Sequence, residues 1–194
     1  MSSMLQERIS RALGDHARVI EEAFKRQSED IAVFAEKTAE AFHQGRRLLV
    51  AGGGPLGPLA DHVANLFLYR LDLERPVLPA ISLGHDQTLA LSLSRDGQTR
   101  QFFARQLRTL AAPGDLLLGF AGTQRDEALE EAVATARSLE CASAVFAGGE
   151  EALGGEEPDF LFTVASDSPA RIMEGALLFG HLLCELVESQ IFGV

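Results

Sequence analysis

The chain has 194 residues, of which 46% are hydrophobic, and it carries a formal net charge of −11. This length is enough for one domain with a sizeable core, so we expect a single domain over residues 1–194. The acidic balance argues against direct nucleic-acid binding, because phosphate backbones are bound by clustered Lys and Arg. No stretch reaches the roughly 18 apolar residues of a membrane span, so the sequence predicts a cytoplasmic protein without membrane contact. The two cysteines fit a reducing compartment.

Residues 1–45 are predicted to form a helical arm. Their apolar side chains mostly recur at spacings of three, four or seven, as on one face of an amphipathic helix. We expect Ser28 to cap the second of two helices in this arm and Gly45 to end it.

From residue 46 onward, short apolar runs alternate with helical patterns. Apolar runs of four to seven residues between helices are typical of strands buried on both faces of a parallel sheet. Strands are expected at 46–52, 77–83, 115–122, 142–148 and 160–164, and helices at 58–71, 87–94, 99–110, 125–139 and from 168 onward. The core, residues 46–194, is therefore predicted to be an α/β fold with helices on both sides of a sheet.

The last helix is well signalled, since Ser168 can cap it and Pro169 suits its first turn. This helix and the arm together carry more apolar surface than one small sheet needs to cover. We therefore expect a homo-oligomer, although the arm could instead pack back on its own sheet.

Residues 52–57 satisfy the pattern G-x-G-x-x-G between a strand and a helix. In dinucleotide-binding proteins this pattern is followed about 20 positions later by an acidic residue at the end of the second strand. Here the acidic residues near that spacing precede the second strand, and Pro55 and Pro58 remove two backbone donors. A tight turn that needs residues without Cβ explains the pattern better than a nicotinamide or flavin site.

Four stretches occur in order along nearly the whole chain: FHQGRRLLVAGGGPLGPLADHVANLF, PAISLGHDQTLALSLSRDGQTRQFF, PGDLLLGFAGTQRDEALEEAVATAR and RIMEGALLFGHLLCELVE. Together they resemble the sugar isomerase (SIS) domain family, and within it the phosphoheptose isomerase group. The resemblance implies a flavodoxin-like three-layer αβα fold and a homotetramer or dimer with sites at subunit interfaces. Family enzymes convert sedoheptulose 7-phosphate into a heptose phosphate through an enediol. Other members bind the replication initiator protein or sense phosphosugars.

The resemblance also implies site residues. The family has a His and a Glu four residues apart after the glycine turn, and a Gln and a His eight residues apart on the last helix. His62 and His181 match the two histidines, whereas Leu66 and Met173 replace the Glu and the Gln. His181 is thereby implied as a catalytic acid or base, and both histidines as metal ligands. Two imidazoles are too few for a dependable zinc site, so no cofactor is firmly expected. Alternatively, His62 is a surface histidine beside Asp61, and His181 is a hydrogen-bonded core histidine.

The phosphate loop of the family is rich in serine, and here its hydroxyls are largely lost. Thr123 keeps one hydroxyl, and Asp126 replaces the last serine. A carboxylate about 4 Å from a phosphate costs of order 1 to 4 kcal/mol per charge pair. Arg125 and Arg95 are candidate cations to offset it. The expected substrate-binding residues are Gly52, Gly53, Gly54, Arg95, Thr123 and Arg125.

Because Leu66 cannot accept a proton, the sequence favours a non-catalytic SIS protein that binds a phosphorylated sugar or a related carbohydrate derivative. The alternative is an active sedoheptulose 7-phosphate isomerase whose base is Asp96, Asp86 or a residue of a neighbouring subunit. Asp96 is the first choice, because the family has an Asn-Asp pair at this place. A third hypothesis is a scaffold that binds a basic protein partner through the acidic loop 150–159.

Overall fold

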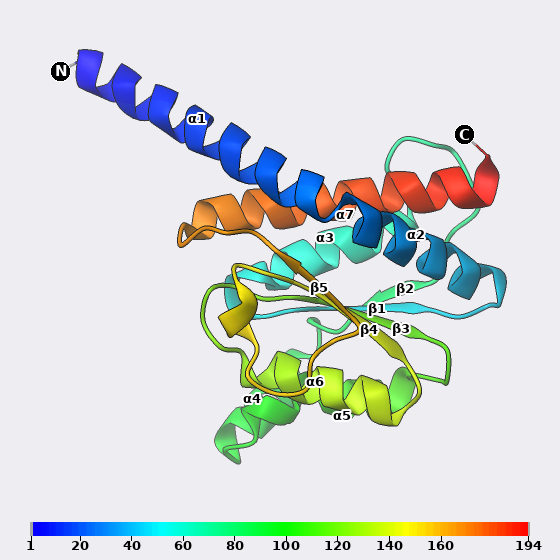
Figure 1. Ribbon diagram of the computed structural model, residues 1–194. Coiled ribbons are helices and arrows are strands. Elements are labelled where there is room, and N and C mark those ends of the chain that lie inside the picture. Colours follow the sequence, from blue (N-terminus) through cyan, green and yellow to red (C-terminus); the bar gives the residue numbers. More distant parts are fainter. Residues whose placement is uncertain (1, 194) are drawn as a thin grey trace.

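The computed structural model describes residues 2–193, and within them five parallel strands form one sheet (Figure 1). The strand order is β2-β1-β3-β4-β5, which is the flavodoxin-like order. The strands are β1 Leu48–Gly52, β2 Ala80–Ser82, β3 Leu116–Phe120, β4 Ala142–Ala147 and β5 Phe160–Thr163. Every residue of β1 and β3 is buried, as the apolar runs predict for central parallel strands.

Helices cover both faces of this sheet, which confirms the three-layer αβα fold (Figure 1). They are α1 Ser2–Arg26, α2 Ser28–His43, α3 Gly57–Leu68, α4 Gln87–Arg95, α5 Phe102–Leu110, α6 Glu127–Ser138 and α7 Pro169–Phe192. One core lies between the sheet and α2, α3 and α7, and includes Phe67 and Phe179. The second core lies under α5 and α6 and includes Leu107 and Leu129.

The strand expected at 77–83 is shorter in the structure. Leu78 donates its N–H to the Phe67 carbonyl at the end of α3 (3.0 Å), and regular pairing with β1 starts at Ala80. The contact with α3 therefore replaces the first part of the expected ladder.

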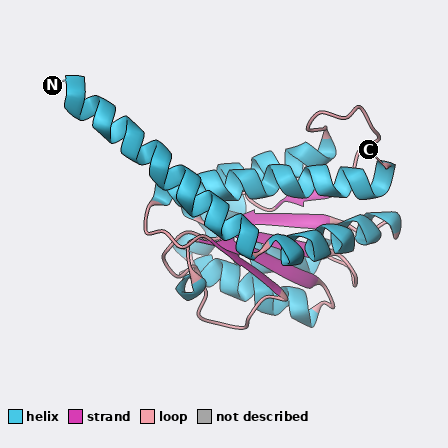
Figure 2. Ribbon diagram, turned by 45° about the horizontal axis from the view of Figure 1, so that its top comes forward, coloured by secondary structure: helices cyan, strands magenta, loops and turns pink. Residues whose placement is uncertain are grey.

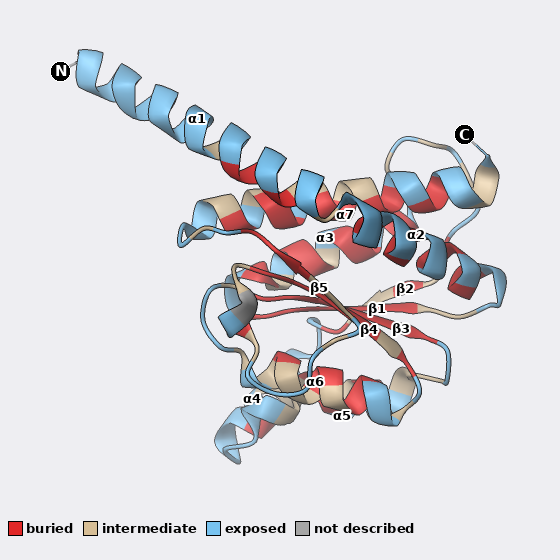
Figure 3. Ribbon diagram, viewed as in Figure 1, coloured by how far each residue is buried: buried red, intermediate tan, exposed pale blue. Residues whose placement is uncertain are grey.

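The N-terminal part of α1 projects away from the rest of the molecule, as two views show (Figures 1 and 2). Only its last turns are buried, around Val19, Ile20 and Ala23 (Figure 3). Its exposed apolar side chains are Met4, Leu5, Ile9 and Leu13. The last turns of α1 and the whole of α2 thus pack on the domain, whereas the first turns of α1 do not, and the homo-oligomer stays a prediction.

The junction between α1 and α2 differs from the expected Ser28 cap. Ser28 is the first residue of α2, and its hydroxyl donates to the Lys25 carbonyl (3.2 Å). Gln27 takes the cap position, and its side chain bonds to edge strand β5. Its amide donates to the Thr163 carbonyl (2.9 Å), and the Thr163 N–H donates to its side-chain oxygen (2.6 Å). A contact between two residues 136 positions apart in the sequence has therefore replaced a local cap.

The other predicted helix boundaries agree better with the structure. Gly45 follows α2 with a φ of +71°, a conformation that glycine adopts without strain. Ser168 precedes α7 and Pro169 opens it, although no cap bond from the Ser168 hydroxyl occurs within residues 2–193. None of the helices in that range is both long and apolar enough to span a membrane.

A buried ion pair fixes the segment between α3 and β2. Arg75 Nε lies 2.6 Å from Glu188 Oε1 on α7, and the two side chains are only 1% and 6% exposed. The Arg75 guanidinium also donates to the carbonyls of Leu66 and Phe67 near the end of α3 (2.9 Å each). One side chain thereby satisfies helix-end carbonyls and ties α3 to α7.

Candidate functional site

The glycine turn between β1 and α3 is tight, as the sequence predicts. A Cβ on Gly52 would lie 2.3 Å from the Leu56 carbonyl oxygen, which no side chain permits. Gly54 has a φ of +49°. The N–H of Gly53 donates to the Phe120 carbonyl (2.9 Å) and so holds the turn against the end of β3.

Asp126 is placed at the start of α6, directly against this turn. Its Oδ1 accepts hydrogen bonds from the N–H groups of Ala128 (3.0 Å) and Leu129 (3.1 Å), as an N-cap residue does. A Cβ on Gly53 would lie 2.0 Å from Asp126 Oδ2. The carboxylate therefore occupies space that only a glycine at position 53 leaves free.

A cavity of about 500 Å³, here named the turn cleft, lies between the glycine turn, the loop before α6 and the start of α7. The residues that line it include Gly53, Gly54, Thr123, Arg125, Asp126 and Met173. The structure thus gathers four of the predicted substrate-binding residues in one cavity. Gly52 lines a smaller cavity of about 270 Å³ between the glycine turn and the helices α4 and α5.

The guanidinium of Arg125 is already paired. Its Nε lies 2.6 Å from Glu130 Oε1, and its Nη2 lies 2.8 Å from Oε2. These bonds to Glu130 raise the pKa of Arg125, and the same bonds lower the pKa of the Glu130 carboxyl. Arg125 therefore offers little free charge to offset Asp126.

The two histidines singled out from the sequence meet across α3 and α7. His62 Nε2 lies 3.3 Å from His181 Nε2, and the rings meet edge to face with centroids 5.6 Å apart. The helices come this close because Gly180 lacks a side chain: a Cβ there would lie 2.4 Å from Val63 Cγ2. A hydrogen bond between two ring nitrogens requires one to accept, so at least one imidazole is neutral in this contact.

The residues present do not fit a zinc ion with four ligands from one chain. Leu66 is only 4% exposed and belongs to the core. Met173 lies in the turn cleft, and eight residues of helix place it about 12 Å from His181 along the axis of α7. Within the described residues, no three His, Cys, Asp or Glu side chains gather as metal ligands would. The histidine pair supplies two of the four ligands that a tetrahedral site needs.

Arg95 and Asp96 pair with each other at the end of α4. Arg95 Nε lies 2.9 Å from Asp96 Oδ1, and the side chains are 78% and 51% exposed. Neither Arg95 nor Asp96 is among the described residues that line the turn cleft. The structure therefore does not bring this proposed cation and base together with the glycine turn.

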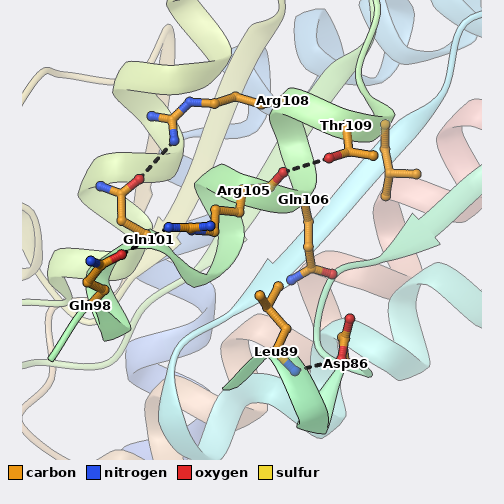
Figure 4. A pocket seen from close by; sticks show the side chains of 9 residues that line it. Asp86, Leu89, Gln98, Gln101, Arg105, Gln106, Arg108 and Thr109 are labelled. Atoms are coloured by element: carbon orange, nitrogen blue, oxygen red, sulfur yellow. Dashed lines mark hydrogen bonds between the residues drawn. The ribbon is translucent and has the colours of Figure 1, made fainter. Parts of the chain in front are cut away.

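Asp86, another candidate base, caps α4 by accepting from the Leu89 N–H (2.8 Å). It lines a cavity of about 740 Å³ beside α4 and α5, shown in Figure 4. Polar side chains there bond one another, for example Arg105 to Gln98 (2.9 Å). The position of Asp86 is that of a capping residue.

A polar cluster at the end of β2 was not foreseen as a unit. Asp61 Oδ1 accepts from the Ser82 hydroxyl and lies 3.2 Å from His85 Nε2. The available signal was the place of Ser82 near the end of an expected strand and of His85 just after it, since side chains at the carboxyl ends of parallel strands converge. The sequence interpretation treated Asp61 only as a neighbour of His62.

A parallel sheet in this order, with a glycine turn facing the start of α6, is the architecture of an SIS domain. Residues 13–147 match the family model of the SIS domain, and the chain belongs to that family. Within it, the chain belongs to the phosphoheptose isomerase-like group. It is 31% identical over 192 residues to a phosphoheptose isomerase of Thermodesulfovibrio yellowstonii, which covers 98% of this chain and 94% of the relative.

Solved structures of the same group agree with the fold. A phosphoheptose isomerase from Francisella tularensis superposes with a TM-score of 0.86 at 27% identity, covering 97% of this chain and 100% of the other. One from Neisseria gonorrhoeae gives a TM-score of 0.85 at 25% identity, covering 95% and 99%. The extent of one domain over 1–194 and the roles of the site residues stay predictions.

Proposed function

We propose that the protein is an aldose–ketose isomerase of phosphorylated sugars, with sedoheptulose 7-phosphate as the first substrate to test. The observation that carries this proposal is the contact between His62 and His181, on a chain similar over nearly its whole length to phosphoheptose isomerases. These relatives support the isomerase better than the non-catalytic binding that the sequence alone favours.

The histidine pair has the chemistry that the reaction requires. Aldose–ketose isomerisation removes a proton next to the carbonyl and protonates the carbonyl oxygen. In the proposed step, the neutral imidazole accepts the carbon-bound proton while the other ring donates its proton to the oxygen. The contact between the two Nε2 atoms then lets a proton pass between the rings.

The turn cleft is the proposed place for the phosphate end of the sugar. Neither His62 nor His181 is among the described residues that line it, so the carbonyl end would extend along α7 toward the histidine pair. Thr123 offers a hydroxyl there, and the glycine turn brings backbone close to the cavity without side chains in the way.

The test is turnover of sedoheptulose 7-phosphate in D₂O, followed by proton NMR for deuterium exchange next to the carbonyl and for the aldose product. We expect turnover by the unaltered protein and a loss of about 100-fold or more in His181→Asn. The exposed His43 on α2 gives a matched control, and His43→Asn should leave the rate unchanged. Absence of both turnover and exchange in the unaltered protein contradicts the proposal. Unchanged turnover in Asp96→Ala leaves that residue without a catalytic role.

A second candidate, binding of a phosphorylated sugar without turnover, is favoured by one observation. Leu66 stands where the family has a glutamate, and it is buried among apolar side chains. For this function, sedoheptulose 7-phosphate raises the free energy of unfolding by about 2.7 kcal/mol at a hundredfold excess over Kd, without any deuterium exchange.

A further inference from the structure

The start of α6 would ordinarily be an anion-binding position. The first N–H groups of a helix have no partner within the helix, and they point out of its N-terminal end, where they can bind an anion. In this chain the N–H groups of Ala128 and Leu129 already donate to Asp126 Oδ1, at 3.0 and 3.1 Å. A phosphate entering the turn cleft meets donors that are occupied by a carboxylate of the protein itself.

The second oxygen of Asp126 is accommodated by Gly53. Any side chain at position 53 would begin 2.0 Å from Oδ2 and would force the carboxylate to move. The position of Asp126 therefore depends on a glycine at position 53, and both residues line the turn cleft.

The charge of Asp126 is not neutralised from within the cleft. Among the described residues that line it, Arg125 is the single basic one, and its Nε and Nη2 both bind the Glu130 carboxylate. A phosphate would therefore face a carboxylate at short range, while the cation beside it is already paired with Glu130, and this is unfavourable.

We propose that Asp126 is a specificity-determining residue, whose carboxylate opposes the phosphate group of a ligand at the start of α6 both by its charge and by occupying the donors there. A phosphorylated sugar binds only by displacing Asp126 from its cap, so this residue sets how strongly the cleft holds phosphate. The inference rests on the proposed function insofar as the ligand is a phosphorylated sugar.

The test compares Asp126→Asn with the unaltered protein in isothermal titration calorimetry at constant ionic strength. The probes are inorganic phosphate, sedoheptulose 7-phosphate and unphosphorylated sedoheptulose. An asparagine caps a helix as well as an aspartate does, so the variant keeps the fold and loses only the charge. Asp126→Ser is a second variant that caps with a shorter, neutral side chain.

We expect both variants to bind the two phosphate-bearing probes about tenfold more tightly or better, and sedoheptulose unchanged. Glu127→Gln is the matched control. It removes the same charge from the next residue, which is exposed and, within the described chain, lies outside the turn cleft. Its affinity should change by about twofold or less, since exposed charges are screened. The inference is overturned if Asp126→Asn binds phosphate no more tightly than Glu127→Gln, or if neither binds it.

Turnover measured on the same samples separates this inference from the proposed function. Tighter phosphate binding by Asp126→Asn without turnover in any sample refutes the proposed isomerase function and leaves the inference about Asp126 standing. If the unaltered protein turns over the substrate and Asp126→Asn leaves the affinity for both phosphate-bearing probes unchanged, the inference about Asp126 is refuted and the proposed isomerase function stands.

Discussion

Replacement of Arg75 by methionine is expected to cause a large loss of stability. Arg75→Met removes the cation from a pair that is almost fully buried and leaves the Glu188 carboxylate without its partner. It also removes the donors to the carbonyls of Leu66 and Phe67. Loss of one partner of a buried ion pair costs about 3 to 5 kcal/mol. For a chain of this size, that corresponds to a fall in Tm of about 6 to 20 °C.

Urea unfolding followed by circular dichroism measures this cost. Arg70→Met is the control, because Arg70 lies in the same segment and pairs with Glu74 at 3.7 Å while the Glu74 side chain is 93% exposed. Such an exposed pair contributes about 0 to 1 kcal/mol. Adding Glu188→Leu to Arg75→Met should restore part of the stability, since no buried charge is then left alone. A cost of Arg75→Met within 1 kcal/mol of the control would refute the reasoning.

Three further predictions concern packing and ionisation. Gly180→Ala should lower the free energy of unfolding by about 1 to 3 kcal/mol despite the better helix propensity of alanine. Gly14→Ala is the control, because a Cβ there would have no neighbour within 4 Å among residues 2–193, and it should raise the free energy of unfolding by about 0.5 to 1 kcal/mol. Equal urea midpoints for Gly180→Ala and Gly14→Ala would contradict the close approach of α3 and α7.

Burial raises the pKa of Cys141 to about 11 and that of Cys184 to about 12, so both thiols should resist Ellman's reagent at pH 8 until urea unfolds the protein. Rapid labelling of the folded protein would contradict the burial of these thiols. Because folding favours the neutral thiols, their contribution to stability is present below pH 9 and declines as the pH rises toward 11. The pKa of Glu130 is lowered, so its contribution is present above pH 4.5 and is lost as the pH falls through the folded-state value. Glu130→Gln should therefore cost stability at pH 7 and little at pH 3, and an equal cost at both would count against the ion pair.

Much of the fold could be predicted from local sequence. The strands β1 and β3 are short apolar runs that are buried on both faces, and the pattern of such runs between helical stretches identifies a parallel sheet. The glycine turn could be recognised as a tight turn because Pro55 and Pro58 made the alternative, an anion site at the start of α3, less suitable. The sheet order came from the resemblance to a known family and not from periodicity.

The site was harder to predict, because its geometry depends on contacts between distant segments. The contact between His62 and His181 joins residues 119 positions apart, and it depends on Gly180, which in the sequence is only a glycine within a helix. The negative charge of Asp126 was recognised, but its contact with Gly53 was not. Arg95 and Asp96 were chosen by family position, whereas in the structure they form an exposed pair at a helix end.

The contact between Gln27 and Thr163 also bears on solubility. β5 is an edge strand with the apolar sequence FLFT, and an edge of this kind is a template for pairing with other chains. The side-chain amide of Gln27 takes the hydrogen bonds that one residue of a sixth strand would make to Thr163. Arg26 adds a positive charge at the same place by donating to the Thr163 hydroxyl (3.1 Å). The bend between the two N-terminal helices thereby blocks the Thr163 end of this edge against pairing with another chain.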